Sequence, residues 1–302
     1  MSIFRGSMVA VISPMVGGIT PDSPIDWGRF KRILDFHVDQ GTAAIVAVGT
    51  TGESATLSEH EHCDAIQRIV TYIDGRIPVI AGTGANSTSE AIRLTKCANE
   101  SGADACLLVT PYYNKPTQDG LYQHHKAIAE AVDVPQILYN VPGRTACDML
   151  PETIARLAEI ENIVGVKEAT GEVERVSQLR AQCGGDFLLL SGDDATGREF
   201  MLAGGDGVIS VTANVAPRQM SDLCTAALAG DVKRAADIDS RLELLHQELF
   251  CESNPIPVKW AMCAMGMAKS GIRLPLTWLP PAGRKRVIKA LKLAGIEHEE
   301  NL

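Results

Sequence analysis

Short apolar runs alternate with longer amphipathic stretches along the whole chain. The apolar runs are rich in Val, Ile and Leu and lack a clean two-residue alternation, which is typical of strands buried on both faces. Eight such runs cover 7–15, 43–49, 78–84, 105–111, 135–142, 163–170, 187–192 and 207–211. The pattern therefore predicts eight buried strands.

Helix-like stretches separate these runs and carry recognisable start and stop signals. Ser58 opens a Ser-Glu-His-Glu capping-box pattern, and Gly75 closes that stretch. The expected helices cover 26–40, 58–75, 89–100, 120–132, 151–160, 172–183 and 196–202. A strand followed by a helix, repeated eight times, predicts an α/β fold in which a parallel sheet closes into a (β/α)8 TIM barrel.

An open, doubly wound sheet is the alternative architecture. It would need a dinucleotide fingerprint at its first turn, and Val16-Gly17-Gly18 does not continue as Gly-x-x-Gly.

The last quarter of the chain has a different, purely helical pattern. Helix-like stretches cover 220–229, 232–250, 258–268 and 283–293, and Asn254-Pro255-Ile256-Pro257 interrupts them. We expect a catalytic barrel over 1–230 and a C-terminal helical appendage over 231–302 that packs on the barrel.

Composition narrows the classes of function. The 302 residues carry a net charge of -9, and the basic cluster Arg284-Lys285-Arg286 is interpreted as a solvated helix face, so nucleic-acid binding is not expected. No run approaches the roughly 18 apolar residues of a membrane span. Eight scattered cysteines without a Cys-x-x-Cys pair, and an N-terminus without signal-peptide features, predict reduced thiols and a cytoplasmic protein.

Lys167 is the most unusual residue, because it stands inside the sixth apolar run. Burial lowers the pKa of a lysine and leaves a neutral amine, the nucleophile that condenses with ketones. Alternation along the strand puts four residues on one face, Ile163, Gly165, Lys167 and Ala169. If that face lines the barrel, Gly165 leaves space beside the amine. A strand-end lysine paired with Glu168 is the alternative.

Active sites of this fold lie at the C-terminal ends of the strands. There, Gly49-Thr50-Thr51-Gly52-Glu53 joins a sharp turn to two hydroxyl groups, and successive backbone N–H groups of such a turn can bind an anion. A plain glycine-rich turn is the alternative.

Three further side chains follow the fourth and fifth runs. The phenol of Tyr139 can pass protons, although a core tyrosine is the common interpretation. Arg144 can bind a carboxylate through two hydrogen bonds or lie on the surface. Tyr112 and Tyr113 form a pair between prolines that suits an interface or a lid.

No pattern of histidines indicates a metal site. His60 and His62 are two residues apart and His124-His125 are adjacent, so neither pair matches His-Glu-x-x-His. Ser191-Gly192-Asp193-Asp194 carries two carboxylates, and we interpret it as a loop that shapes the end of the seventh strand.

Four motifs in order resemble those of a known family: Gly49-Thr50-Thr51-Gly52-Glu53-Ser54, Thr110-Pro111-Tyr112-Tyr113-Asn114, Tyr139-Asn140-Val141-Pro142-Gly143-Arg144-Thr145 and Gly165-Val166-Lys167-Glu168-Ala169-Thr170-Gly171. The chain strongly resembles the dihydrodipicolinate synthase (4-hydroxy-tetrahydrodipicolinate synthase) family over essentially its whole length. The wider group includes N-acetylneuraminate lyase and other pyruvate-dependent aldolases, and Arg144 is the narrower marker.

The resemblance implies a lyase of diaminopimelate and L-lysine biosynthesis that condenses pyruvate with L-aspartate 4-semialdehyde without a metal or organic cofactor. Lys167 would form a Schiff base with pyruvate. Thr50, Tyr139 and Tyr113 would relay protons, and Tyr113 would come from a neighbouring subunit of a homodimer or homotetramer.

Substrate-binding roles are implied for three more positions. Backbone amides of Thr50 and Thr51 would hold the pyruvate carboxylate, and Arg144 would hold the carboxylate of the second substrate. Ile209 would place its backbone carbonyl near the lysine.

The family also has an allosteric pocket for L-lysine at a dimer interface. The matching positions are Ala55, Glu59, His62, Gly84, Asn86, Glu90 and Tyr112. Glu59 departs from the histidine of some lysine-inhibited members, which weakens the expectation of an L-lysine effector.

Two other functions compete with this interpretation. Another Schiff-base aldolase, such as N-acetylneuraminate lyase, would share Lys167 and Tyr139 but would not need Arg144 in this role. A non-catalytic barrel that senses an amino acid has no need for this combination of lysine, tyrosines, threonine and arginine.

Overall fold

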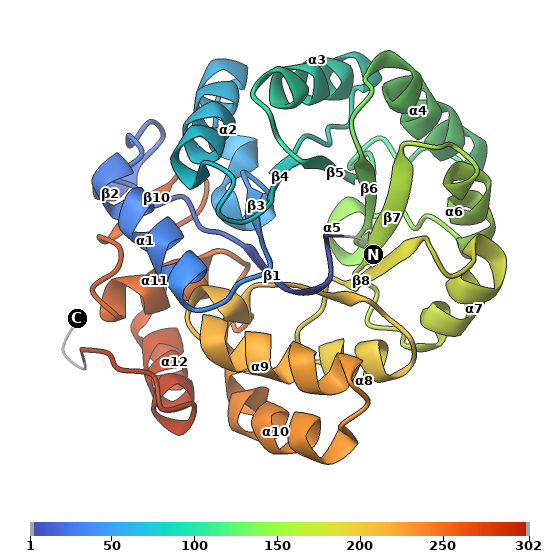
Figure 1. Ribbon diagram of the computed structural model, residues 1–302. Helices are drawn as coiled ribbons and strands as arrows, with labels where there is room; N and C mark the ends of the chain where they lie inside the picture. Colours follow the sequence, from blue (N-terminus) through green and yellow to red (C-terminus); the bar gives the residue numbers. More distant parts are fainter. Residues whose placement is uncertain (1–2, 300–302) are drawn as a thin grey trace.

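The computed structural model describes residues 3–299 and has the expected barrel at its centre (Figure 1). Eight parallel strands close in the order β1-β3-β4-β5-β6-β7-β8-β9, so each strand pairs with the next one along the chain. These strands are β1 (Gly6–Ala10), β3 (Ala44–Ala47), β4 (Val79–Gly82), β5 (Ala105–Val109), β6 (Gln136–Asn140), β7 (Ile163–Glu168), β8 (Leu188–Ser191) and β9 (Gly207–Ser210). Each lies within its predicted apolar run or begins one residue from it, which confirms the TIM-barrel prediction.

Helices surround the barrel on the outside (Figure 1). They are α1 (Trp27–Asp39), α2 (Glu59–Ile73), α3 (Thr88–Glu100), α4 (Gln118–Ala131), α6 (Pro151–Ala158), α7 (Glu174–Cys183), α8 (Gly197–Leu202) and α9 (Pro217–Leu228). The predicted capping box at the start of α2 is confirmed, because Ser58 Oγ accepts from the Glu61 N–H and the Glu61 carboxylate accepts from the Ser58 N–H. Within the described residues, no helix is long and apolar enough to cross a membrane.

The C-terminal region adds α10 (Val232–Glu248), α11 (Ile256–Ala264) and α12 (Pro281–Leu293), as predicted. One continuous apolar cluster joins these helices to the barrel's outer layer, with Phe30 and Met220 on one side and Trp260 and Val287 on the other. The boundary near residue 230 stays an interpretation.

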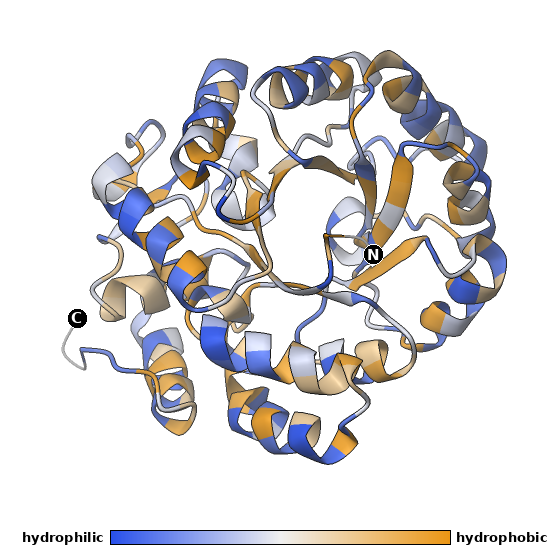
Figure 2. Ribbon diagram, in the orientation of Figure 1, coloured by the Kyte–Doolittle hydropathy of each residue, from blue (hydrophilic) through white to orange (hydrophobic). Residues whose placement is uncertain are grey.

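The apolar core has two layers, visible as orange strands and inner helix faces in Figure 2. Met8, Val46, Leu107 and Leu190 fill the barrel interior. Side chains on the opposite faces of the strands pack against the helices. A strand buried on both sides has no polar face, which explains why the runs in the sequence are continuous rather than alternating.

Two short strands and one short helix were not predicted. β2 (Gly18–Thr20) and β10 (Gly271–Arg273) form a small parallel sheet outside the barrel, and α5 (Pro142–Thr145) follows β6. Elements of three or four residues are too short to carry a periodic signal.

The predicted inner face of β7 is wrong at its first residue. The register to β6 shifts, because Gln136 pairs with Ile163 but Ile137 pairs with Gly165. This bulge turns Ile163 toward the helices, while Lys167 keeps its place inside the barrel. The predicted role of Gly165 is also wrong: a Cβ there would lie 2.5 Å from the Leu188 Cβ, so this glycine permits close approach of β8.

The prediction of reduced thiols is wrong for one pair of cysteines. Cys63 in α2 and Cys97 in α3 form a disulfide, with their Cα atoms 6.1 Å apart. The two residues are 34 positions apart in the sequence, one strand–helix unit, and only the packing of adjacent helices brings them together. The other six cysteines are free thiols.

A buried ion pair connects the C-terminal region to the loop after β3. Lys259 in α11 is fully buried and donates a hydrogen bond to Glu53, which is 2% exposed. The second Glu53 oxygen accepts from the Arg273 N–H at 2.9 Å. The Arg273 guanidinium in turn bonds to Glu61 at 2.6 Å. These contacts fix the loop that begins at Gly49.

Lys259→Met should lower the free energy of unfolding by about 3–5 kcal/mol, because it leaves the Glu53 charge buried without its partner. The double variant Glu53→Gln/Lys259→Met should recover much of this loss, and urea denaturation measures both. Glu59→Gln is the matched control, since it breaks the exposed Glu59–Arg93 pair and should barely change the midpoint. A Lys259→Met protein as stable as the wild type would contradict the proposed anchoring.

Candidate active site

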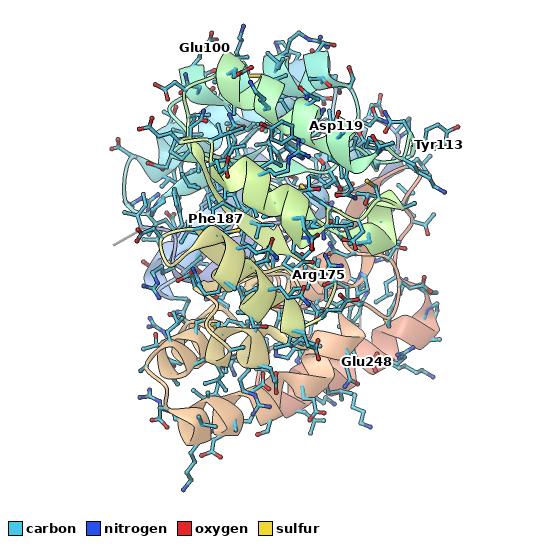
Figure 3. The ribbon with its side chains drawn as sticks, turned by 90° about the vertical axis from the view of Figure 1, so that its right-hand side faces the viewer. Glu100, Tyr113, Asp119, Arg175, Phe187 and Glu248 are labelled. Atoms are coloured by element: carbon cyan, nitrogen blue, oxygen red, sulfur yellow. A yellow bond between two sulfur atoms is a disulfide. The ribbon has the colours of Figure 1, made fainter. Side chains whose placement is uncertain are left out.

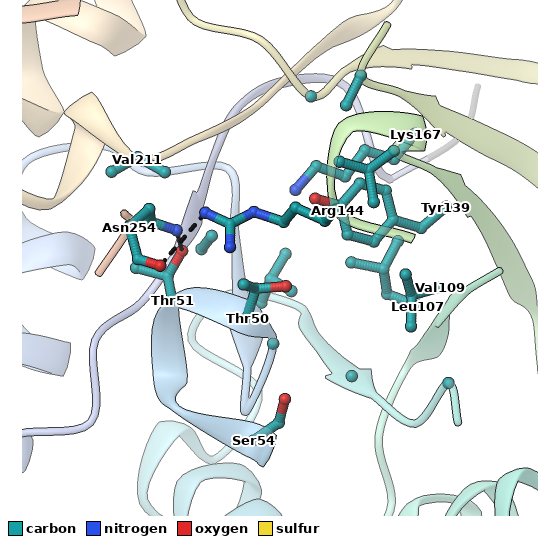
Figure 4. A pocket seen from close by; sticks show the side chains of 18 of the residues that line it. Thr50, Thr51, Ser54, Leu107, Val109, Tyr139, Arg144, Lys167, Val211 and Asn254 are labelled. Carbon is teal, nitrogen blue, oxygen red and sulfur yellow. Dashed lines mark hydrogen bonds between the residues drawn. The ribbon is translucent and has the colours of Figure 1, made fainter. Parts of the chain in front are cut away.

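A cavity of about 170 Å³ lies at the C-terminal ends of the barrel strands. Lys167, Tyr139, Thr50, Thr51 and Arg144 all line it. Figure 4 shows the Lys167 amine, the Tyr139 phenol and the Arg144 guanidinium around a common space. Five residues that the sequence singled out for chemistry on separate strands and loops therefore meet in one place.

Lys167 is held inside the barrel near the end of β7. Its side chain is 6% exposed, and Nζ lies 4.3 Å from the centre of the Tyr139 ring on the neighbouring strand. Burial lowers the pKa of Lys167 to about 8; the Asp194 charge opposes this shift and the Arg144 charge adds to it. The amine is thus substantially neutral only slightly above neutral pH.

The alternative pairing of Lys167 with Glu168 is not found. Successive residues of a strand point to opposite faces, and Glu168 turns away from the cavity. Its carboxylate accepts from Asn140 Nδ2 at 3.2 Å and from the Thr170 N–H at 2.9 Å, and Arg175 lies 3.7 Å away. Glu168, the carboxylate next to Lys167 on β7, therefore does not neutralise the lysine.

Gly192 makes room for the lysine, a role that the sequence analysis assigned to Gly165. A Cβ at Gly192 would lie 2.8 Å from Lys167 Cε and 2.6 Å from the Ala169 Cβ. The loop Ser191-Gly192-Asp193-Asp194 therefore lies directly against the amine-bearing side chain. The sequence shows Gly192 beside two carboxylates, but nothing in the sequence indicates that this loop contacts β7.

Tyr139 is almost fully buried beside the lysine. Burial raises the pKa of its phenol, whereas the Arg144 charge and a hydrogen bond with the Thr50 side chain lower it. The Tyr139 phenol is therefore neutral at neutral pH. It can donate its proton on one side and accept another from the Thr50 hydroxyl on the other.

The turn after β3 has the geometry expected of an anion-binding loop. Thr50–Gly52 forms one turn of 3-10 helix, and the first N–H groups of a helical turn have no acceptor within it. Glu53 follows in the left-handed conformation, with φ 61°, and its buried carboxylate anchors the turn. Thr50 and Thr51 are therefore presented by a rigid loop.

Asn254, which the sequence analysis treated only as part of a helix interruption, joins two sides of the site. Its Nδ2 donates to Thr51 Oγ1 at 3.0 Å, and its backbone carbonyl accepts from Arg144 Nη2 at 3.2 Å. Asn254 is 6% exposed and lines the cavity together with Phe250, at the end of α10. The C-terminal region thus contributes directly to the site.

Two predicted residues do not line the cavity within this single chain. Tyr113 is 89% exposed and projects from the surface, as Figure 3 shows. Ile209 is buried in β9 and packs in the barrel interior with Tyr139.

The residues predicted for an effector site lie beside the cavity on α2, α3 and the adjoining loops. Asn86 Nδ2 donates to the Tyr112 carbonyl at 3.2 Å, and burial together with the Glu90 charge raises the pKa of Tyr112. His62 Nε2 lies 2.7 Å from the Gly82 carbonyl, and Glu59 pairs with Arg93.

Two other predicted effector positions adjoin these residues, since Ala55 is exposed and Gly84 lines the cavity itself.

Residues 3–299 contain no cluster of three or more His, Cys, Asp or Glu side chains that could hold a metal ion.

Comparison with known proteins gives a consistent result. The model of the dihydrodipicolinate synthetase family matches residues 3–294. The chain is 62% identical to the 4-hydroxy-tetrahydrodipicolinate synthase of Methylococcus capsulatus over 97% of this chain and 100% of the relative. It is 60% identical to the enzyme of the same name from Pseudomonas aeruginosa over 97% and 99%, respectively.

Solved structures agree with these relatives. A chloride-inhibited dihydrodipicolinate synthase from Acinetobacter baumannii, in complex with pyruvate, is 56% identical, with a TM-score of 0.94 and coverage of 97% of this chain and 99% of that one. A lysine-bound enzyme from Cyanidioschyzon merolae is 36% identical, with a TM-score of 0.94 and coverage of 98% and 100%.

Proposed function

The chain belongs to the dihydrodipicolinate synthetase family, and from this premise we propose how its site works. The reaction is the condensation of pyruvate with L-aspartate 4-semialdehyde to 4-hydroxy-tetrahydrodipicolinate, in diaminopimelate and L-lysine biosynthesis. The observation that carries the mechanism is the Lys167 amine, buried in the barrel with a pKa near 8 and 4.3 Å from the centre of the Tyr139 ring.

Lys167 attacks the ketone carbon of pyruvate in its neutral form. The carbinolamine loses water and becomes a protonated imine, which draws electrons from the methyl carbon. Loss of a methyl proton then gives an enamine. The protonated imine on Lys167 is the electron sink, so a residue of this chain supplies the chemistry.

Proton transfers in these steps pass through Tyr139 and Thr50. The phenol lies beside the amine and its raised pKa keeps it protonated between transfers. The Thr50 side chain, hydrogen-bonded to it, extends the path away from the lysine. Backbone amides of Thr50 and Thr51 hold the pyruvate carboxylate, because both begin a helical turn whose N–H groups face no internal acceptor.

The enamine carbon then attacks the aldehyde of the second substrate. Arg144 binds the carboxylate of that substrate, supported by its hydrogen bond to the Asn254 carbonyl. The substrate's amine displaces Lys167 and closes the ring. We assign the Ile209 backbone carbonyl, on the strand that closes the barrel, to a place near the lysine, where it would orient the nitrogen groups; Ile209 packs in the barrel interior with Tyr139.

Tyr113 completes the proton path from a neighbouring subunit. Its side chain is 89% exposed on a surface loop, which is unusual for a large aromatic residue in a single chain. A homodimer, or a homotetramer built from two such dimers, would cover it. We place this assembly in the cytoplasm.

L-Lysine is proposed as an effector at the surface formed by Ala55, Glu59, His62, Gly84, Asn86, Glu90 and Tyr112. Glu90 offers a carboxylate for an ammonium group, and Gly84 connects this surface to the cavity. Inhibition by L-lysine in a steady-state assay is expected. Unchanged activity at saturating L-lysine would contradict this proposal while leaving the catalytic one intact.

Borohydride reduction in the presence of pyruvate should place a stable adduct on Lys167. Because neutral Lys167 is the attacking species and its pKa is about 8, the initial rate should rise as the pH passes that value and level off above it. Peptide mass mapping locates the adduct. Lys259, equally buried but paired with Glu53, is an internal control that should stay unmodified. Trapping that persists in Lys167→Ala would refute the mechanism.

Arg144→Ala should raise the KM for aspartate semialdehyde about 10- to 100-fold, the loss expected when a charge-assisted bond of roughly 1.5–3 kcal/mol is removed. Pyruvate trapping on Lys167 should persist, because Arg144 does not bind pyruvate, but its pH profile should move to higher pH, because the Arg144 charge lowers the pKa of Lys167. Comparison of aspartate semialdehyde with a sugar aldehyde separates this function from an N-acetylneuraminate lyase: efficient condensation with the sugar alone would favour the lyase.

A further inference from the structure

Asp194 is a buried carboxylate to which the mechanism above gives no role. It follows β8 in the loop that Gly192 brings against Lys167, and it is 3% exposed. Its Oδ2 accepts two backbone hydrogen bonds, from the Val211 and Thr212 N–H groups, each at 2.9 Å. These donors hold the carboxylate at a fixed position next to two residues that line the cavity, Asp193 and Val211.

The second oxygen of Asp194 is unsatisfied. Oδ1 is buried and has no hydrogen-bond partner among the described residues. No salt bridge with a lysine or arginine is found for Asp194 in residues 3–299 either, in contrast to Asp206, which pairs with Arg5 and Arg180. A buried carboxylate oxygen without a partner is costly, and a positive charge that forms nearby during the reaction would offset that cost.

We propose that Asp194 is the counter-ion of the protonated imine on Lys167, an inference that rests on the proposed function. Imine formation turns a neutral nitrogen into a cation inside the barrel. The geometry places a carboxylate in the adjoining loop, fixed by two N–H donors and with one oxygen free, to balance that cation. When the methyl proton leaves, the C–H electron pair forms the C=C bond of the enamine and the C=N π pair moves onto nitrogen, which neutralises the cation.

The charged groups around Lys167 support this assignment. Tyr139 on β6 is a neutral phenol, and Arg144 on α5 is a cation that disfavours positive charge on the amine. The charge of Asp194 acts in the opposite direction and raises the pKa of Lys167. The Asp194 charge also acts on the Cys224 thiol of α9, whose pKa burial and this charge raise to about 12. Cys224 is therefore uncharged and does not compete for the carboxylate.

Asp194→Asn removes the charge but keeps an oxygen that can accept from Val211 and Thr212. Without the negative charge of Asp194, the ammonium form of Lys167 and the protonated imine are both less stable. The pH profile of borohydride trapping on Lys167 should therefore move to lower pH by about one unit, since a nearby opposite charge shifts a pKa by one to three units. Exchange of the pyruvate methyl protons in D2O, which reports enamine formation without the second substrate, should show the same displacement.

Asp193→Asn is the matched control, because it removes one charge from the same loop. The Asp193 carboxylate is half-buried and lines the cavity, but it accepts from the Thr196 N–H and hydroxyl at 3.0 and 2.7 Å, so its removal should leave the pH midpoint in place. Asp194→Ser, which also lacks the charge but retains a small acceptor, provides a second variant and should shift the profile in the same direction as Asp194→Asn.

The outcomes separate this inference from the proposed function. A wild-type protein without an adduct on Lys167 overturns both. Normal wild-type trapping with an unshifted midpoint in folded Asp194→Asn, or an equal shift in Asp193→Asn, overturns the counter-ion role alone. A merely structural role of Asp194 would reduce the amount of adduct without moving its pH dependence.

Discussion

The removal of one amine from water is the constraint on which this structure depends. An isolated lysine prefers to be charged and hydrated, and here a closed barrel wall with packed side chains on both faces buries it near Tyr139. The same burial lowers its pKa to about 8 and supplies the nucleophile. Burial of Lys167 thus lowers the free energy of unfolding, and burial of the apolar layers around it offsets this loss. An open sheet would leave an edge through which water reaches the nitrogen.

The C-terminal helices act as part of the catalytic unit rather than as an appendage. Lys259 and Arg273 fix the loop after β3 through Glu53, and Asn254 bonds both Thr51 and Arg144. Thr51 and Arg144 are each proposed to bind a substrate carboxylate. A segment outside the barrel therefore holds these two residues in a fixed position relative to each other. This explains how short loops at the strand ends reach a defined geometry, because each is bonded to the same C-terminal scaffold.

Much of the fold could be predicted because the barrel strands are buried on both faces and appear as continuous apolar runs. Lys167 could be predicted because a charge interrupts such a run. Gly192, Asp194 and Asn254 could not be assigned in this way, since their importance comes from contacts between segments far apart in the chain. The bulge in β7 and the Cys63–Cys97 disulfide likewise depend on tertiary packing, which periodicity does not encode.

The charges around Lys167 also fit the order of the proposed steps. Before imine formation the amine must be neutral, and the field of Arg144 favours that state. After imine formation the nitrogen is a cation, and Asp194 favours that state instead. A carboxylate that binds Arg144 cancels much of the guanidinium's field, so arrival of the second substrate favours the protonated imine that forms again when the enamine attacks the aldehyde. One fixed set of side chains can therefore favour a neutral amine before pyruvate reacts and a charged imine after the new C–C bond forms, because the second substrate itself changes the local charge.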